Sequence, residues 1–82
     1  MQGKRVDRPD DSIFESGEYG KISTGQWYCC PPDTELIGNL SGHEVIEHED
    51  GTITVSPSIL INARHKGKEW HGFLERGVWR QV

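Results

Sequence analysis

Cysteine and histidine are the residue types in this chain best suited to chemistry. The two cysteines, Cys29 and Cys30, are adjacent, and all four histidines follow them. A closed zinc site needs four such ligands, often spaced as C-x₂₋₄-C and H-x₃₋₅-H. Neighbouring side chains on a strand point to opposite faces, which separates the two thiols. The spacing therefore predicts no bound metal and no cofactor, with a small zinc-binding structural module as the alternative, whose ligands would come from Cys29, Cys30, His43, His48, His65 and His71.

Catalytic patterns are incomplete. Residues 43–48, HEVIEH, are one residue too long for the H-E-x-x-H motif of zinc proteases, and they indicate a strand rather than a helix. Cys30 and His71 have the residue types of a nucleophile and its base, but nothing in the sequence marks either as activated. We therefore predict no enzymatic activity and keep a small hydrolase-like enzyme as a second alternative. Four carboxylates near a turn, Glu44, Glu47, Glu49 and Asp50, indicate a solvated acidic surface.

Trp70 is the candidate for partner binding. The chain has three tryptophans in 82 residues, and aromatic residues are enriched where protein interfaces bind most strongly. Trp27 and Trp79 fit a core, whereas Trp70 stands beside charged residues. We therefore expect Trp70 to be partly exposed, and Phe73 and Trp79 to share the buried face of a hairpin.

Turn signals between short apolar runs predict a mostly β fold. Asp50-Gly51 separates two runs with strand-like alternation, which is a strong hairpin signal. We expect a small antiparallel sheet or half-barrel of about five strands, built from two hairpins. A Ser56-Pro57-Ser58 step should break or kink the edge between them. The expected strands are residues 26–30, 35–40, 43–48, 52–55, 59–61, 69–74 and 78–82, where some segments continue one another.

The chain length allows one domain with a thin core. Residues 1–12 are rich in charge and poor in apolar side chains, so they predict a flexible N-terminal arm. Residues 13–82 then form a single β-rich domain. The expected core consists of Trp27, Tyr28, Ile37, Leu40, Val45, Ile53, Val55, Ile59, Ile61, Phe73, Leu74 and Trp79.

Charge and composition limit the partners and the location. The net charge is −4, whereas nucleic-acid binding needs a clustered excess of Lys and Arg, so nucleic acid is not the expected partner. No apolar stretch has the length of a membrane span, and the first residues lack the apolar region of a signal peptide. Adjacent cysteines do not suit a disulfide scaffold, so we expect a reducing, cytoplasmic location. Edge strands without a covering helix would allow a homodimer by sheet pairing.

The C-terminal half carries a family resemblance. Pro57-Ser58-Ile59-Leu60 followed by His71-Gly72-Phe73 in a Gly-turned hairpin resembles a group of small phage and prophage proteins of unknown function. Some of these carry the label "ammonia monooxygenase" from automated annotation. The resemblance covers residues 27–80 and implies a metal held by a Cys-rich knuckle and a Cys-His step. This chain lacks the C-x-x-C spacing and has Trp70 in place of the cysteine, which implies an incomplete metal site.

These observations together favour a non-enzymatic interaction protein. We expect a phage- or prophage-type protein in the cytoplasm of a bacterial host, presenting an acidic sheet surface to a larger protein partner.

Overall fold

The computed structural model describes residues 1–10, 14–63 and 68–82, and within these ranges it contains eight strands and no helix. This confirms the mostly β prediction, although about five strands were expected. The strands are β1 (Lys4–Arg5), β2 (Glu18–Lys21), β3 (Trp27–Cys29), β4 (Gly38–Asn39), β5 (Glu44–Glu47), β6 (Ile53–Ala63), β7 (Lys68–Glu75) and β8 (Val78–Gln81).

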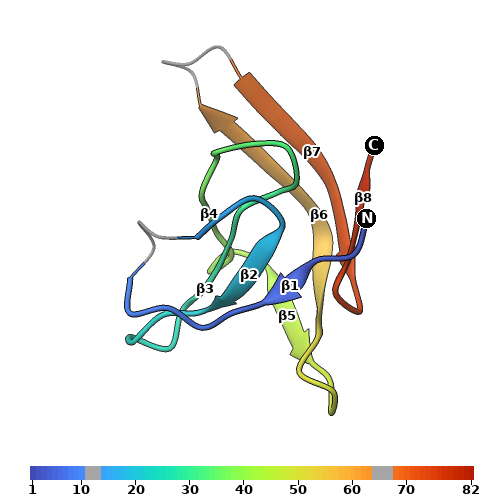
Figure 1. Cartoon of the computed structure of the whole chain (residues 1–82). Helices are drawn as coiled ribbons and strands as arrows, with labels where there is room; N and C mark the ends of the chain where they lie inside the picture. Colours follow the sequence, from blue (N-terminus) through green and yellow to red (C-terminus); the bar gives the residue numbers. More distant parts are fainter. Residues whose placement is uncertain (11–13, 64–67) are drawn as a thin grey trace.

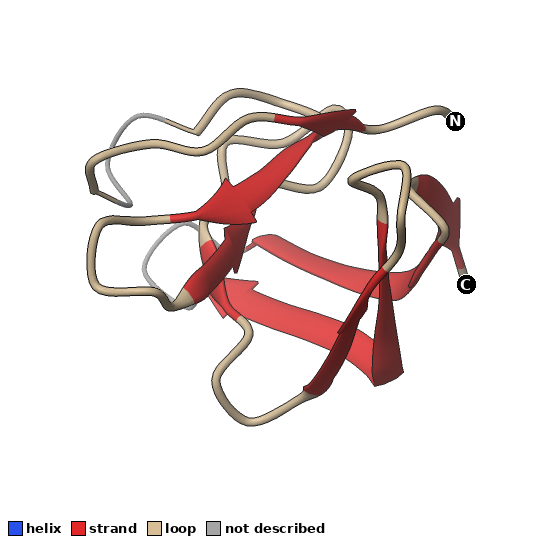
Figure 2. Ribbon diagram, turned by 90° about the horizontal axis from the view of Figure 1, so that it is seen from below, coloured by secondary structure: helices blue, strands red, loops and turns tan. Residues whose placement is uncertain are grey.

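The strands form two four-stranded sheets that face each other (Figures 1 and 2). The first sheet has the order β1-β2-β3-β4, with β1 parallel to β2 and the other neighbours antiparallel. The second sheet has the order β5-β6-β7-β8 and is antiparallel throughout. In the described part of the chain, the two sheets do not close into a barrel.

Both predicted hairpins are present in the second sheet. Between β5 and β6, the Gly51 N–H donates to the His48 carbonyl at 3.0 Å, and Gly51 has a φ of 87°. Between β7 and β8, Arg76 and Gly77 have φ values of 46° and 76°, as in a type I′ turn. Glycine reaches this left-handed region without steric cost, which explains why both turns end on one.

The predicted kink lies inside β6. The register of β6 against β7 shifts between Val55 and Ile59, and the Ser56–Pro57 peptide is cis. The step therefore bends a continuous strand and does not end it. The strand expected over residues 35–40 is much shorter, because only Gly38–Asn39 pairs with β3.

One core joins the two sheets. Six predicted core residues are buried: Leu40, Ile53, Val55, Ile59, Leu74 and Trp79; three others, Trp27, Val45 and Ile61, pack partly buried against them. The prediction was wrong for Tyr28, Ile37 and Phe73, which are only half-buried. Their places are taken by buried residues that the prediction left out: Phe14, Tyr19, Cys29, Cys30, Leu36 and Trp70.

The prediction of a flexible arm is wrong for the described residues 1–10, and residues 11 and 12 lie outside the described residues. β1 pairs with β2, and the Val6 N–H donates to the Tyr19 carbonyl at 2.9 Å. The Gly3 N–H donates to the Gly77 carbonyl at 2.7 Å, which ties the first residues to the second sheet as well. Charged side chains predicted an arm, but it is the backbone that pairs here. The first ten residues thus belong to the same domain as the rest.

Across the described residues, no helix is long and apolar enough to cross a membrane.

Candidate interaction surface

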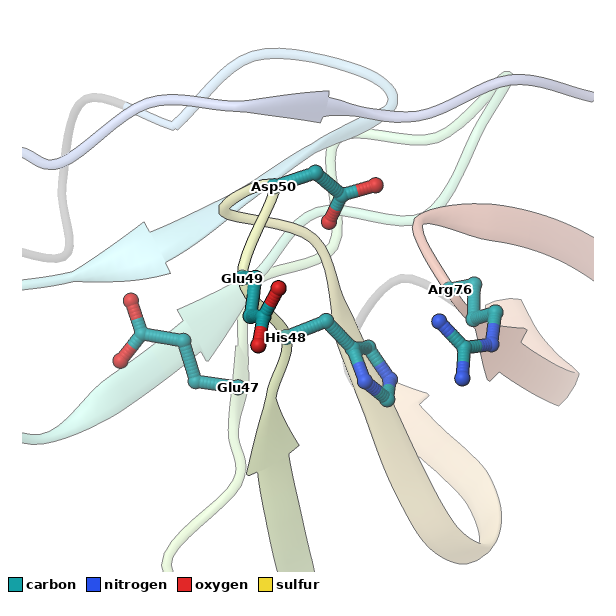
Figure 3. Close-up of a pocket in the computed structure, with 5 residues that line it drawn as sticks. All are labelled: Glu47, His48, Glu49, Asp50 and Arg76. Atoms are coloured by element: carbon teal, nitrogen blue, oxygen red, sulfur yellow. The ribbon is translucent and has the colours of Figure 1, made fainter.

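The expected acidic surface lies on β5 and the turn of residues 48–52, which together we call the acidic hairpin. The turn borders an open hollow, with Arg76 of the β7–β8 turn on the far side. Figure 3 shows His48 and Arg76 directed to the same side of the hairpin, whereas Glu47 points the opposite way. The residues that line the hollow are Glu47, His48, Glu49, Asp50 and Arg76.

A hydroxyl joins the acidic hairpin to the β7–β8 turn. The Thr54 Oγ1 lies 2.7 Å from His48 Nε2 and accepts the Arg76 N–H at 3.1 Å. These two contacts fix the position of His48 and hold the main chain of Arg76. The Arg76 guanidinium itself has no ion pair within the described residues.

Glu47 fastens the hairpin to the first sheet. Its carboxylate accepts from Arg5 Nη1 at 3.0 Å and lies 3.6 Å from Lys21 Nζ. Arg5 and Lys21 both lie over the Trp27 ring, 4.8 and 5.0 Å from its centroid. The hydrogen bond from Arg5 holds the pKa of Glu47 below its ordinary value. Arg5 also donates to the Gly51 carbonyl at 2.8 Å, so one guanidinium supports the strand and its turn.

The other three carboxylates differ in their contacts: Asp50 is hydrogen-bonded within the turn, whereas Glu44 and Glu49 form no ion pair with any described residue. Asp50 accepts from the Thr52 hydroxyl at 2.6 Å and from its N–H at 3.0 Å, and these bonds lower the pKa of Asp50. Asp50 therefore shapes the turn. Glu44 and Glu49 are exposed and form no ion pair with any described residue. Between them on β5 lies Ile46, which is 47% exposed.

The prediction that Trp70 is exposed was wrong. Trp70 is 2% exposed, and its ring packs edge-on against Trp79 with centroids 5.3 Å apart. Alternation along β7 puts Trp70, Gly72 and Leu74 on one face, and the register sets Leu74 opposite Trp79. Phe73 is opposite Arg80 and lies on the outer face. Trp70 is therefore a core residue and not the exposed aromatic side chain that was expected.

The two cysteines are buried. Both are free thiols, and burial raises the pKa of Cys29 to about 12 and also raises the pKa of Cys30. Cys30 Sγ lies 3.5 Å from the Thr34 carbonyl. No group of three potential metal ligands occurs among the described residues, and His65 lies outside them.

His71 is paired with Ser58, for which the sequence predicted only a kink in the chain. Its Nε2 lies 2.9 Å from Ser58 Oγ, and His43 Nε2 lies 3.1 Å from the Ser58 carbonyl. Cys30 and His71, the nucleophile and base considered above, thus have different partners: Thr34 in the β3–β4 loop and Ser58 on β6.

The sequence did not lead us to expect Ile46 or Arg5 as part of the acidic hairpin and its support. Val45 and Ile46 are consecutive, so only one of them can face the core of a two-layer fold, and this was a signal for an exposed Ile46. The contact between Arg5 and Glu47 joins residues far apart in the chain and had no local signal.

No family model, curated protein or solved structure matches the chain.

Proposed function

We propose that this is a non-enzymatic interaction protein whose acidic hairpin binds a cationic surface of a larger protein. One observation carries the proposal: Glu44 and Glu49 stand exposed on the hairpin, and neither has a cationic partner among the described residues. Glu47 and Asp50 add negative charge beside them, although Arg5 and Lys21 partly offset Glu47.

Such a surface suits recognition by charge. Complementary charges at an interface steer encounter and exclude wrong partners. The fixed position of the turn also lowers the conformational cost of binding, because Arg5, Thr52 and Thr54 already hold it. The resemblance to small phage and prophage proteins supports a place in the cytoplasm of a bacterial host, where the partner is a host protein or a protein of a competing phage.

Capture from a bacterial lysate tests this proposal. The immobilised chain should retain one or a few proteins, and raised salt should release them because exposed charges are screened. Glu49→Lys should abolish the capture. Glu35→Lys is the matched control, since Glu35 is also exposed and lines a different hollow, together with Cys30 and Thr34. Equal capture by wild type and Glu49→Lys would contradict the proposal.

A small hydrolase is the second candidate, and the Ser58–His71 pair is the observation that favours it. The Oγ–Nε2 distance of 2.9 Å is in the range of a nucleophile and its base. It ranks lower because no described group bonds the other ring nitrogen of His71 to orient it. A fluorophosphonate probe should label Ser58 in the wild type and not in His71→Ala if the candidate is correct. Failure to label the wild type would dismiss it.

A further inference from the structure

We infer that β5 pairs with β5 of a second copy of this chain, antiparallel and centred on Ile46. This dimer would join the two second sheets into one. The inference goes beyond the proposed function, because it uses the backbone edge of β5 together with Ile46 and Glu44, whereas Glu49 at the turn remains free for a partner.

The backbone of β5 has an open side. The His48 N–H donates to the Thr52 carbonyl at 2.8 Å, so position 48 faces β6. Backbone direction alternates along an antiparallel strand. Ile46 and Glu44 therefore also face β6, while Val45 and Glu47 direct their N–H and carbonyl groups away from it. No backbone hydrogen bond to those outward groups occurs within the described residues.

The other sheet edges are less suited to pairing. On β8, the Trp79 N–H donates to the Met1 carbonyl at 2.7 Å, and Gly3 covers Gly77 in the same way. β1 and β4, at the edges of the first sheet, have only two residues each. β5 is thus the longest edge strand that no described segment covers. Of the residues that commonly protect such edges, it contains two Glu but neither Pro nor Lys.

The side chains of β5 are self-complementary in one register. Residues whose backbone N–H and carbonyl groups point away from β6 must pair with residues of the same kind in the second copy. In the register that we propose, Val45 is opposite Glu47 of the second copy. This register sets Ile46 opposite Ile46 and Glu44 opposite His48. The exposed side chain of Ile46 is then covered by Ile46 of the second copy. Glu44 meets the imidazole of His48, and Glu47 meets the nonpolar side chain of Val45, so no carboxylate lies opposite another carboxylate. Cross-strand pairs of this kind stabilise sheets, whereas like charges directly opposite destabilise them.

His48 can make its contact without losing the one it has. Thr54 occupies its Nε2. The Nδ1 atom is then the one that meets Glu44 of the second copy. A four-residue strand buries little area, so we expect a dimer that forms at submillimolar and not at nanomolar concentration.

Cysteine cross-linking tests the register. Opposed residues of a non-hydrogen-bonded pair have Cα atoms about 4.5 Å apart, and a disulfide spans about 4.4–6.8 Å. Ile46→Cys should therefore form a cross-linked dimer under mild oxidation at least about tenfold faster than Glu44→Cys, because pairing holds the two new thiols together. Both positions are exposed, so both variants should fold. The wild type is the negative control, because its own two thiols are buried and should not form a cross-link.

Sedimentation of the wild type and of Ile46→Lys completes the test. The wild type should show a concentration-dependent dimer, and Ile46→Lys, which sets two like charges opposite each other, should be monomeric. A wild-type monomer throughout, a dimer that persists in Ile46→Lys, or equal cross-linking of the two cysteine variants would each overturn the inference. None of these outcomes bears on capture through Glu49, so the proposed function stands or falls separately.

Discussion

Two tryptophans of the core, Trp70 and Trp79, are in edge-to-face contact. Trp70 and Trp79 are each 2% exposed, whereas Phe73 is half-buried beneath Arg80. Replacing a buried aromatic residue with alanine costs about 3–5 kcal/mol. We expect Trp70→Ala and Trp79→Ala to lose this much free energy of unfolding in urea titrations, which leaves a chain of this size close to unfolded.

Phe73→Ala is the matched control on the same strand. Its cost should be clearly smaller, because part of the ring already contacts water. If Trp70→Ala were the milder of the two, Trp70 would not be the core residue described here.

Glu18 is the one buried charged residue in the described core, and it should make stability depend on pH. Burial opposes its ionisation, but the Glu15 N–H and the Arg8 guanidinium, at 2.9 and 2.8 Å, outweigh burial and lower the pKa of Glu18. A lowered pKa in the folded state stabilises the fold above the unfolded value, 4.5, and this contribution is lost as the pH falls below it.

The free energy of unfolding should therefore be level near neutral pH and decrease below about 4.5. Glu18→Gln should cost about 3 kcal/mol at neutral pH, because it leaves the Arg8 charge without its partner, and should flatten the decrease in acid. Urea titrations across this range check both effects, with Glu35→Gln as the exposed control. An unchanged acid slope in Glu18→Gln would assign the slope to other carboxylates.

The alternation of side chains along a strand explains why the prediction for β7 was right about which residues share a face and wrong about which face is buried. The sequence shows that Trp70, Gly72 and Leu74 share one face of a strand and that His71 and Phe73 share the other. It does not show which face meets the core. That choice depends on the register with β8, where Leu74 and Trp79 are opposite each other.

Local signals located the hairpins and missed the N-terminal strand. The turns at Gly51 and Gly77 need only a few neighbouring residues, so the sequence predicts them. β1 depends on a parallel pairing with β2, about fourteen residues later. Its hydrogen bonds come from the backbone, and its charged side chains suggested an arm.

Deleting residues 1–8 should therefore destabilise the domain. The deletion removes β1 and its pairing with β2, exposes the edge of β8 at Trp79, and leaves Glu18 without Arg8. We expect a fall in melting temperature of at least about 10 °C, together with new self-association through the uncovered edge. Thermal melts and sedimentation measure these two effects.

Gly20→Ala offers the same test in a full-length chain. A Cβ at Gly20 would collide with the Val6 carbonyl, so the N-terminal segment must move away from β2. Gly25→Ala is a poorer control because Gly25 has a positive φ; Gly42→Ala is better, since a Cβ there meets open space. A truncated chain that melts within a few degrees of the full-length one would show that the N-terminal pairing contributes little.

At the scale of the whole molecule, the two sheets share one core. Tyr19 and Cys29 of the first sheet pack in the same cluster as Ile53, Leu74 and Trp79 of the second. Neither sheet can bury its inner face alone, so we expect a single cooperative unfolding transition. Tryptophan fluorescence reports both sheets and should coincide with the circular dichroism of the backbone. Two separated transitions would contradict a shared core.

The acidic hairpin could be predicted in part, because its carboxylates, like the hairpin turns, depend on residues that are close together in the sequence. The carboxylates around Asp50-Gly51 gather within a few residues, so their clustering on one turn follows from the sequence. The support they receive from Arg5, Lys21 and Trp27 comes from the first sheet and needed the structure. The open edge of β5 likewise follows from the order of strands in the sheet.

Amide hydrogen exchange at three consecutive residues tests most directly whether β5 is the binding edge of the molecule. In dilute protein, Ile46 should be protected by its bond to β6, while Val45 and Glu47 should exchange rapidly. At high concentration, Val45 and Glu47 should become protected and Ile46 should change little. Exchange at Val45 and Glu47 that stays rapid at every concentration would contradict the account.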